Sequence, residues 1–164
     1  MYKNQYKIIK EFYKNKRILI TGATGFKGSW LAFWLSKIGA KVYTIGNNPN
    51  KNKSLFYGLN LEKKTKLSIL DIRNFSKLDL VIKKIKPEII FHLAAQPLIF
   101  ESYKKPKDTY EINALGTLNL LESCRQNKSL KSLICVTSDK CYESNYSLKG
   151  FKETDKLGGK DPYS

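Results

Sequence analysis

At 164 residues the chain is long enough for one domain with a substantial core, and it contains neither an apolar run that could span a bilayer nor an apolar signal segment, so no membrane partner is expected. Its formal charge of +16 comes from 30 Lys and Arg against 14 Asp and Glu. The lysines are spread along the whole chain, and arginine occurs only at Arg17, Arg73 and Arg125. We therefore expect the lysines to lie on solvent-exposed faces, and we expect no specific nucleic-acid partner. The 3 cysteines are odd in number and lack CxxC spacing, which predicts reduced thiols in a cytoplasmic protein and no metal site.

The first part of the chain predicts an edge helix, a buried strand, a glycine turn and a second helix. An amphipathic stretch over 6–13 predicts a short helix without chemistry of its own. The apolar run 18–20 then predicts a strand covered on both faces. Gly22, Gly25 and Gly28 follow before an apolar helical stretch, in the spacing GxxGxxG.

This arrangement favours a dinucleotide site. Gly22 would allow a tight turn, Gly25 would let backbone N–H groups approach a pyrophosphate, and Gly28 would let the helix pack closely. The helix N-terminus adds a partial positive charge. A phosphate loop of the NTPase kind is excluded because that motif needs Gly-Lys-Ser/Thr, whereas the order here is Lys27-Gly28-Ser29.

Two further strands are predicted at 41–45 and 66–70. The first leads into a polar connection that lacks the Asp or Glu that often binds the adenosine ribose, so Asn47 or Asn48 would take that place. These residues do not decide whether the cofactor is NAD or NADP. Asp71 follows the next strand. It would either accept from the adenine amino group or cap the helix that begins near Asn74.

The second half of the chain repeats the alternation. A helical stripe over 75–85 ends before Pro87, a strand over 88–93 holds His92 as a packed residue, and Ala94-Ala95 would let backbone approach a ligand. A long helix over 106–127 and a strand over 133–138 follow, and 143–164 is turn-rich. The helix residues expected to face the sheet are Tyr110, Leu115, Leu118, Leu120 and Leu121.

Alternating strands and helices predict an α/β fold of the Rossmann type. The parallel sheet is doubly wound, with right-handed crossovers and strand order 3-2-1-4-5. A cofactor is expected over the carboxyl ends of strands 1 and 4.

Six segments together resemble the extended short-chain dehydrogenase/reductase family of nucleotide-sugar enzymes, and within it the 4,6-dehydratases. The block over 137–142 and the entry at 26–30 are the specific parts, since the whole family shares the glycine pattern. The segments are Thr21–Trp30, His92–Leu98, Ser102-Tyr103, Asn113–Thr117, Thr137–Tyr142 and Asp161–Ser164.

The resemblance implies NAD as cofactor and a nucleotide-sugar substrate, with CDP-glucose expected. Oxidation at C4 would acidify the C5 proton, water would leave across C5 and C6, and the hydride would return to C6. Residues expected to contact NAD are Gly22, Thr24, Gly25, Phe26, Lys27, Gly28, Asp71, Ile72, Leu93, Ala94, Ala95 and Gln96.

The same resemblance assigns catalytic roles. Tyr163 as phenolate would take the proton of the sugar 4-hydroxyl, Ser138 would hydrogen-bond the 4-oxygen, and Asp139 would protonate the leaving 6-hydroxyl. Lys140 stands where related dTDP-glucose dehydratases carry a glutamate, and would either remove the C5 proton or stabilise the enolate. Gln96 and Ser102 are expected near the nicotinamide and the sugar.

The family pattern continues Tyr-x-x-x-Lys, whereas this sequence stops at Ser164, one residue after Tyr163. Residues 1–164 are therefore expected to be an incomplete NAD-binding domain without its C-terminal substrate-binding part, unable to turn over substrate alone. The full-length form is expected to be a homo-oligomer, and the family implies a role in polysaccharide synthesis. Alternatives are a GDP-mannose dehydratase, a UDP-hexose epimerase or a noncatalytic nucleotide-binding module.

Overall fold

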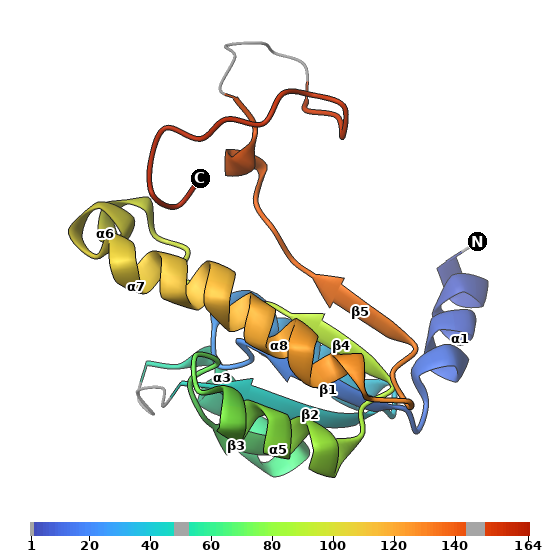
Figure 1. The fold of residues 1–164 in the computed structure, drawn as a ribbon. Helices are drawn as coiled ribbons and strands as arrows, with labels where there is room; N and C mark the ends of the chain where they lie inside the picture. The colour runs from blue at the N-terminus through green and yellow to red at the C-terminus, as the bar shows by residue number, and fades with distance from the viewer. Residues whose placement is uncertain (1, 48–52, 144–149) are drawn as a thin grey trace.

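The computed structural model describes residues 2–47, 53–143 and 150–164, which form one five-stranded sheet with helices on both faces (Figure 1). The strands are β1 (Arg17–Thr21), β2 (Lys41–Gly46), β3 (Lys66–Ile69), β4 (Ile89–His92) and β5 (Ser132–Cys135). The helical elements are α1 (Tyr2–Tyr13), α2 (Phe26–Lys37), α3 (Leu55–Gly58), α4 (Leu61–Lys64), α5 (Phe75–Ile85), α6 (Ile99–Lys104), α7 (Pro106–Tyr110), the π-helical η1 (Glu111–Leu115), α8 (Gly116–Arg125) and the 3₁₀ turn η2 (Asp139–Cys141).

The sheet has the predicted order β3-β2-β1-β4-β5, and every strand pair in it is parallel. In the central register Ile18 of β1 lies opposite Val42 of β2 on one side and Ile89 of β4 on the other. From β1 the chain first builds the sheet outward through β2 and β3, and it then crosses back to add β4 and β5 on the other side of β1. The carboxyl ends of β1 and β4 therefore lie at the switch point where a doubly wound sheet binds its ligands. The predicted fold class is confirmed.

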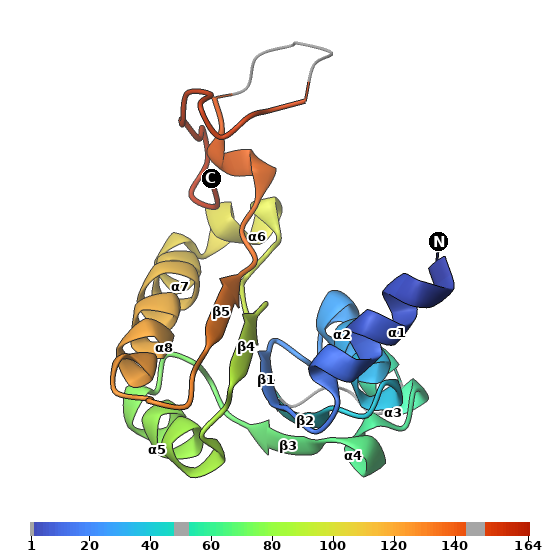
Figure 2. The ribbon, with the colours of Figure 1, turned by 90° about the vertical axis from the view of Figure 1, so that its right-hand side faces the viewer.

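Strand β1 is buried on both faces, and its alternating side chains serve two cores. Ile18 and Ile20 pack with α2, α3 and α4 on one face, whereas Leu19 packs with α5 and α8 on the other. Figure 2 shows these two helix layers on opposite sides of the sheet. This two-sided burial explains why the strand reads as an uninterrupted apolar run.

The long helix over 106–125 differs from the prediction in the face that it turns to the sheet. Leu120 is fully buried, but Tyr110, Leu115, Leu118 and Leu121 are 59%, 53%, 58% and 45% exposed, so the expectation that they face the sheet is wrong. The buried face instead uses small side chains. Gly116 is the clearest case, because a Cβ there would lie 2.6 Å from Ile72 Cδ1. The helix therefore leaves an exposed apolar face, defined here as Tyr110, Leu115, Leu118 and Leu121.

After β5 the chain leaves the sheet and crosses above its carboxyl edge (Figure 1). The strand ends at Cys135, three residues before the predicted end. Val136 N still donates to His92 O at 3.0 Å, but within the described part of the chain residues 137–138 pair with no neighbouring strand. Residues Tyr142 and Leu157 form an isolated antiparallel bridge, and Tyr142 stacks on Phe151. Of the helices in the described ranges, none is both long enough and apolar enough to cross a bilayer.

Candidate cofactor-binding site

The glycine turn joins the end of β1 to the start of α2 with no room for side chains at two positions. Gly22 has φ +68°, and a Cβ there would lie 2.6 Å from the backbone of Leu93 and Ala94. A Cβ on Gly28 would lie 2.3 Å from Gly22 O, so the first turn of α2 packs directly on the loop. Both close approaches need glycine, and together they bring the turn, α2 and the exit of β4 to one point.

The N-terminus of α2 offers backbone donors at this point. Gly25 is its N-cap residue and supplies no capping side chain, and the first turn contains no acidic residue. The first helical bond runs from Ser29 N to Gly25 O at 2.9 Å, so the N–H groups of Phe26, Lys27 and Gly28 precede the hydrogen-bond ladder of the helix. Such an end favours an anion through its free donors and its dipole.

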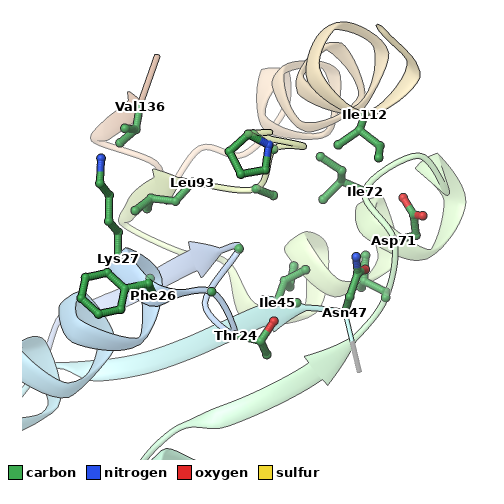
Figure 3. Close-up of a pocket in the computed structure, with 18 of the residues that line it drawn as sticks. Thr24, Phe26, Lys27, Ile45, Asn47, Asp71, Ile72, Leu93, Ile112 and Val136 are labelled. Carbon is green, nitrogen blue, oxygen red and sulfur yellow. The ribbon is translucent and has the colours of Figure 1, made fainter. Parts of the chain in front are cut away.

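A cavity of about 610 Å³ opens above this turn, along the carboxyl ends of the central strands (Figure 3). Its volume is in the range of pockets that hold small ligands and cofactors. It is lined by Gly22, Thr24, Gly25, Phe26, Lys27, Gly28, Ile45, Gly46, Asn47, Leu70, Asp71, Ile72, Leu93, Ala94, Ala95, Pro97, Ile112, Val136, Thr137 and Tyr163.

The lining contains every residue predicted to contact the cofactor except Gln96. The sequence analysis missed Ile45, Gly46, Leu70, Pro97, Ile112, Val136 and Thr137. Most of these stand within two residues of a strand's carboxyl end, so position relative to the predicted strands was a usable signal. Ile112 has no such signal, because the fold of η1 brings it to the cavity.

One rim of the cavity carries an ion-pair cluster. Both oxygens of the Asp71 carboxylate are engaged by Arg73: Oδ1 accepts from the Arg73 backbone N at 2.9 Å, and Oδ2 accepts from Nη2 at 2.7 Å. These hydrogen bonds lower the pKa of Asp71. Arg73 Nη1 also lies 3.3 Å from Asp108 and 3.5 Å from Glu111, so the loop after β3 is tied to α7 and η1.

The alternative of Asp71 as a helix cap is not what the structure shows. Asn74 caps α5, since its Oδ1 accepts from Lys77 N at 3.0 Å. Asp71 instead lines the cavity, as does Asn47 after β2, and Asn48 lies outside the described residues. These polar side chains are the groups available to a ribose or an adenine at this rim.

His92 is packed inside the fold, as predicted. Its side chain lies between β1 and α8, and the residue is only 4% exposed. Nδ1 lies 2.6 Å from Thr21 Oγ1, and Nε2 lies 2.9 Å from Thr117 Oγ1. Burial lowers the pKa of His92 from 6.5 to about 4, so the ring is neutral at pH 7.

This burial predicts a pH-dependent stability. In the unfolded chain the ring titrates near 6.5, so between that pH and about 4 the unfolded state binds a proton that the folded state does not. The free energy of unfolding should therefore fall by about 3 kcal/mol as the pH drops through this window. Urea unfolding at several pH values measures the slope, and a His92→Gln variant should lack it. An equal slope in that variant would assign it to other groups.

Two predicted substrate contacts, Gln96 and Ser102, stand outside the lining of this cavity. The Gln96 side chain accepts from Leu98 N at 2.6 Å and donates to Thr109 Oγ1 at 3.0 Å. Ser102 is fully buried, and its hydroxyl donates to Ile99 O at 2.7 Å. In the structure both side chains therefore hold the loop and helix beside the site.

The predicted catalytic residues lie on two segments near the cavity. Tyr163 lines it, together with Thr137. Ser138 caps the N-terminus of η2, where its hydroxyl accepts from Lys140 N at 3.2 Å, and Asp139 and Lys140 are exposed. Asp161 Oδ1 accepts from Tyr163 N at 2.9 Å. Hydrogen bonds from Ser164 and Tyr163 lower the pKa of Asp161, and the nearby charge of Lys140 adds to this effect, so the η2 turn and the Tyr163 turn lie close together.

The fold and the cavity define a Rossmann-type domain with a ligand-sized cavity at the carboxyl edge of its sheet, and comparison with known proteins gives the family. A model of the family described as GDP-mannose 4,6 dehydratase matches residues 19–164. The chain belongs to this family, which confirms the predicted place among the extended short-chain dehydrogenases/reductases.

Individual relatives agree with this assignment. The chain is 45% identical over 157 residues to the CDP-glucose 4,6-dehydratase of Salmonella typhimurium, covering 96% of this chain and 44% of that protein. Among solved structures, an epimerase from Methanothermobacter thermautotrophicus superposes with a TM-score of 0.84 at 26% identity, covering 97% of this chain and 46% of the other.

A second solved structure is a Thermus thermophilus UDP-glucose 4-epimerase in complex with NAD, with a TM-score of 0.77 at 29% identity, covering 90% of this chain and 46% of the other. The chain thus spans less than half the length of each of these relatives.

Proposed function

We propose that the protein to which this chain belongs is an NAD-dependent nucleotide-sugar 4,6-dehydratase acting on CDP-glucose. The observation that carries the proposal is the cavity above the glycine turn, which Tyr163 joins from the far end of the sequence. The 45% identity to a CDP-glucose 4,6-dehydratase supports the choice of substrate. An NAD complex of a structural neighbour supports the choice of cofactor.

The residues present fit NAD. The absence of side chains at Gly22 and Gly28 lets the turn, α2 and the exit of β4 pack closely, and the donors of Phe26, Lys27 and Gly28 suit a diphosphate. Asn47 and Asp71 at the rim offer polar groups to the adenosine end. When bound, NAD would accept a hydride from C4 of the sugar and return it to C6.

The protein's own groups would move the protons. Tyr163 would take the proton of the 4-hydroxyl, and Ser138 would hydrogen-bond the 4-oxygen as it becomes a carbonyl. The carbonyl acidifies the neighbouring C5 proton. Asp139 would protonate the 6-hydroxyl as it leaves as water.

Lys140 would act at C5. It is exposed, and we propose that as an ammonium group it stabilises the enolate, while the C5 proton leaves to solvent water and a proton returns from water to C5 when the hydride reaches C6. A proton-abstracting role would need burial or nearby cations that favour the neutral amine.

Two measurements test this function. The purified 164-residue chain should bind NAD by calorimetry, with NADP as a comparison, and binding should weaken as salt rises because the ligand is anionic. The longest natural form of the protein should convert CDP-glucose to the CDP-4-keto-6-deoxy sugar. Absence of NAD binding would contradict the cofactor proposal, and turnover of GDP-mannose in preference would contradict the substrate.

An epimerase is the second candidate, because solved epimerase structures superpose on this chain. Epimerisation at C4 shares the oxidation step but needs no acid for elimination, so the Asp139-Lys140 pair favours the dehydratase. Mass spectrometry separates the two, since only dehydration removes the mass of water.

We further propose that the protein works in the cytoplasm as a homo-oligomer and supplies sugars for polysaccharide synthesis. Free Cys124, Cys135 and Cys141 suit a reducing compartment. The exposed apolar face of α7–α8 suits a subunit contact. Cell fractionation and sedimentation of the full-length protein test the compartment and the assembly.

A further inference from the structure

A chain of hydrogen bonds runs from the loop after β4, through His92, to the π-helical turn η1. Ala94 N donates to Thr21 Oγ1 at 3.3 Å, and Thr21 Oγ1 lies 2.6 Å from His92 Nδ1. On the other side of the ring, Nε2 lies 2.9 Å from Thr117 Oγ1, which lies 2.7 Å from Asn113 O. The chain therefore crosses from the sheet to the helix through one imidazole.

The proton count fixes the direction of every bond in this chain. Asn113 O can only accept, so the single hydroxyl proton of Thr117 is used there. His92 Nε2 must then donate to Thr117 Oγ1, and the neutral ring leaves Nδ1 as an acceptor for Thr21. The Thr21 oxygen is thereby free to accept from Ala94 N.

The far end of the chain returns to the same loop. Gln96 N donates to Asn113 Oδ1 at 2.8 Å, and Asn113 Nδ2 donates to Gln96 O at 3.1 Å. Asn113 lies in η1, and π-helical turns often reposition side chains at functional sites. Residues 94–96 are therefore held at both ends, and Leu93, Ala94, Ala95 and Pro97 form one wall of the cavity.

We propose that His92 is a positioning residue for the cofactor cavity, because its Nε2–H tautomer completes a one-way hydrogen-bond chain that fixes the loop 94–96. The inference rests on the proposed function in that NAD is the ligand that uses this wall. His92 itself stands outside the lining and acts through the loop.

Spectroscopy tests the proton order directly. His92 is the only histidine in the chain, so the imidazole nitrogens give a single set of ¹⁵N-NMR signals. We expect a protonated Nε2 and an unprotonated Nδ1 at neutral pH. An Nδ1–H tautomer or a protonated ring would overturn the proposal.

Variants at Thr117 test the effect on the loop. Thr117→Val removes the acceptor for Nε2–H while keeping the side-chain volume, whereas Thr117→Ser keeps the hydroxyl. Ser123→Ala is a matched control, because Ser123 Oγ also donates to the carbonyl four residues earlier, Asn119 O at 2.8 Å, on the same helix. It therefore loses the same back-bond without touching His92.

We expect Thr117→Val to raise the dissociation constant for NAD and the amide hydrogen-exchange rates of Ala94 and Gln96 by about 10-fold each. Thr117→Ser and Ser123→Ala should stay near wild type. Unchanged exchange at Ala94 and Gln96 in Thr117→Val would overturn the positioning role. If the wild type does not bind NAD, the proposed function fails, while the exchange rates and the tautomer still decide the inference. If the wild type binds NAD and Thr117→Val changes the exchange rates but not the dissociation constant, the loop is fixed for another purpose and the inference about the cavity is wrong.

Discussion

Replacing Gly22 with alanine is expected to destabilise the chain by about 3 kcal/mol or more and to abolish NAD binding. Two costs add at this position. The residue has φ +68°, which alanine adopts only with strain, and its Cβ would lie 2.6 Å from the backbone of Leu93 and Ala94. Because backbone cannot move aside as a flexible side chain can, β1 and the exit of β4 would have to separate. Urea unfolding and calorimetry with NAD measure the two effects.

Gly39→Ala is the matched control. Gly39 also has positive φ, at +91°, but a Cβ there would meet only Lys14 Cγ at 3.7 Å, an ordinary contact. The free energy of unfolding of this variant should fall by about 1 kcal/mol from backbone strain alone, and the variant should bind NAD normally. Equal losses for Gly22→Ala and Gly39→Ala would show that the close approach of the two loops does not contribute.

Replacing Tyr163 with phenylalanine in the longest natural form of the protein is expected to lower kcat about 1,000-fold. The phenol lines the cavity and is the proposed acceptor of the 4-hydroxyl proton, so its loss should block oxidation at C4, the first step. NADH formation, followed by its absorbance, should then be lost together with sugar dehydration. Tyr6→Phe is a control, because Tyr6 is exposed on α1.

The same assay separates the roles of the acidic and basic residues of η2. Asp139→Asn should still oxidise C4 and exchange the C5 proton with deuterated water, while elimination slows about 100-fold for want of an acid. Lys140→Met should slow the C5 exchange itself. If Asp139→Asn eliminated water at the wild-type rate, the acid would be another group, and full-rate elimination by Lys140→Met would remove both roles considered for it.

Local patterns were sufficient for the parts of the fold that depend on neighbours in sequence. The apolar run of β1 and the glycine spacing after it predicted the strand, the turn and the direction of α2. Alternation of strands and helices predicted the sheet order. The resemblance then identified eleven residues that line the cavity. Each of them follows a strand whose carboxyl end lies at the same edge of the sheet, so local sequence order was enough to bring them together.

Other features depended on contacts between distant segments. The amphipathic pattern of the long helix did not reveal which face meets the sheet, because Gly116 against Ile72 sets that packing and leaves Leu118 exposed. The Gln96 side chain has the donor and the acceptor that a ligand could use, but in the structure its amide hydrogen-bonds to Leu98 and Thr109 instead.

The sequence by itself determined the order of the strands, the glycine turn and the family, because these follow from periodicity and from residues adjacent in the chain. Only the tertiary structure decided the direction of the bonds around His92 and the arrival of Ile112 at the cavity. The physical reason is that a side chain's hydrogen-bond partners and burial are set by backbone brought from elsewhere in the fold, and no local pattern of residues encodes that approach.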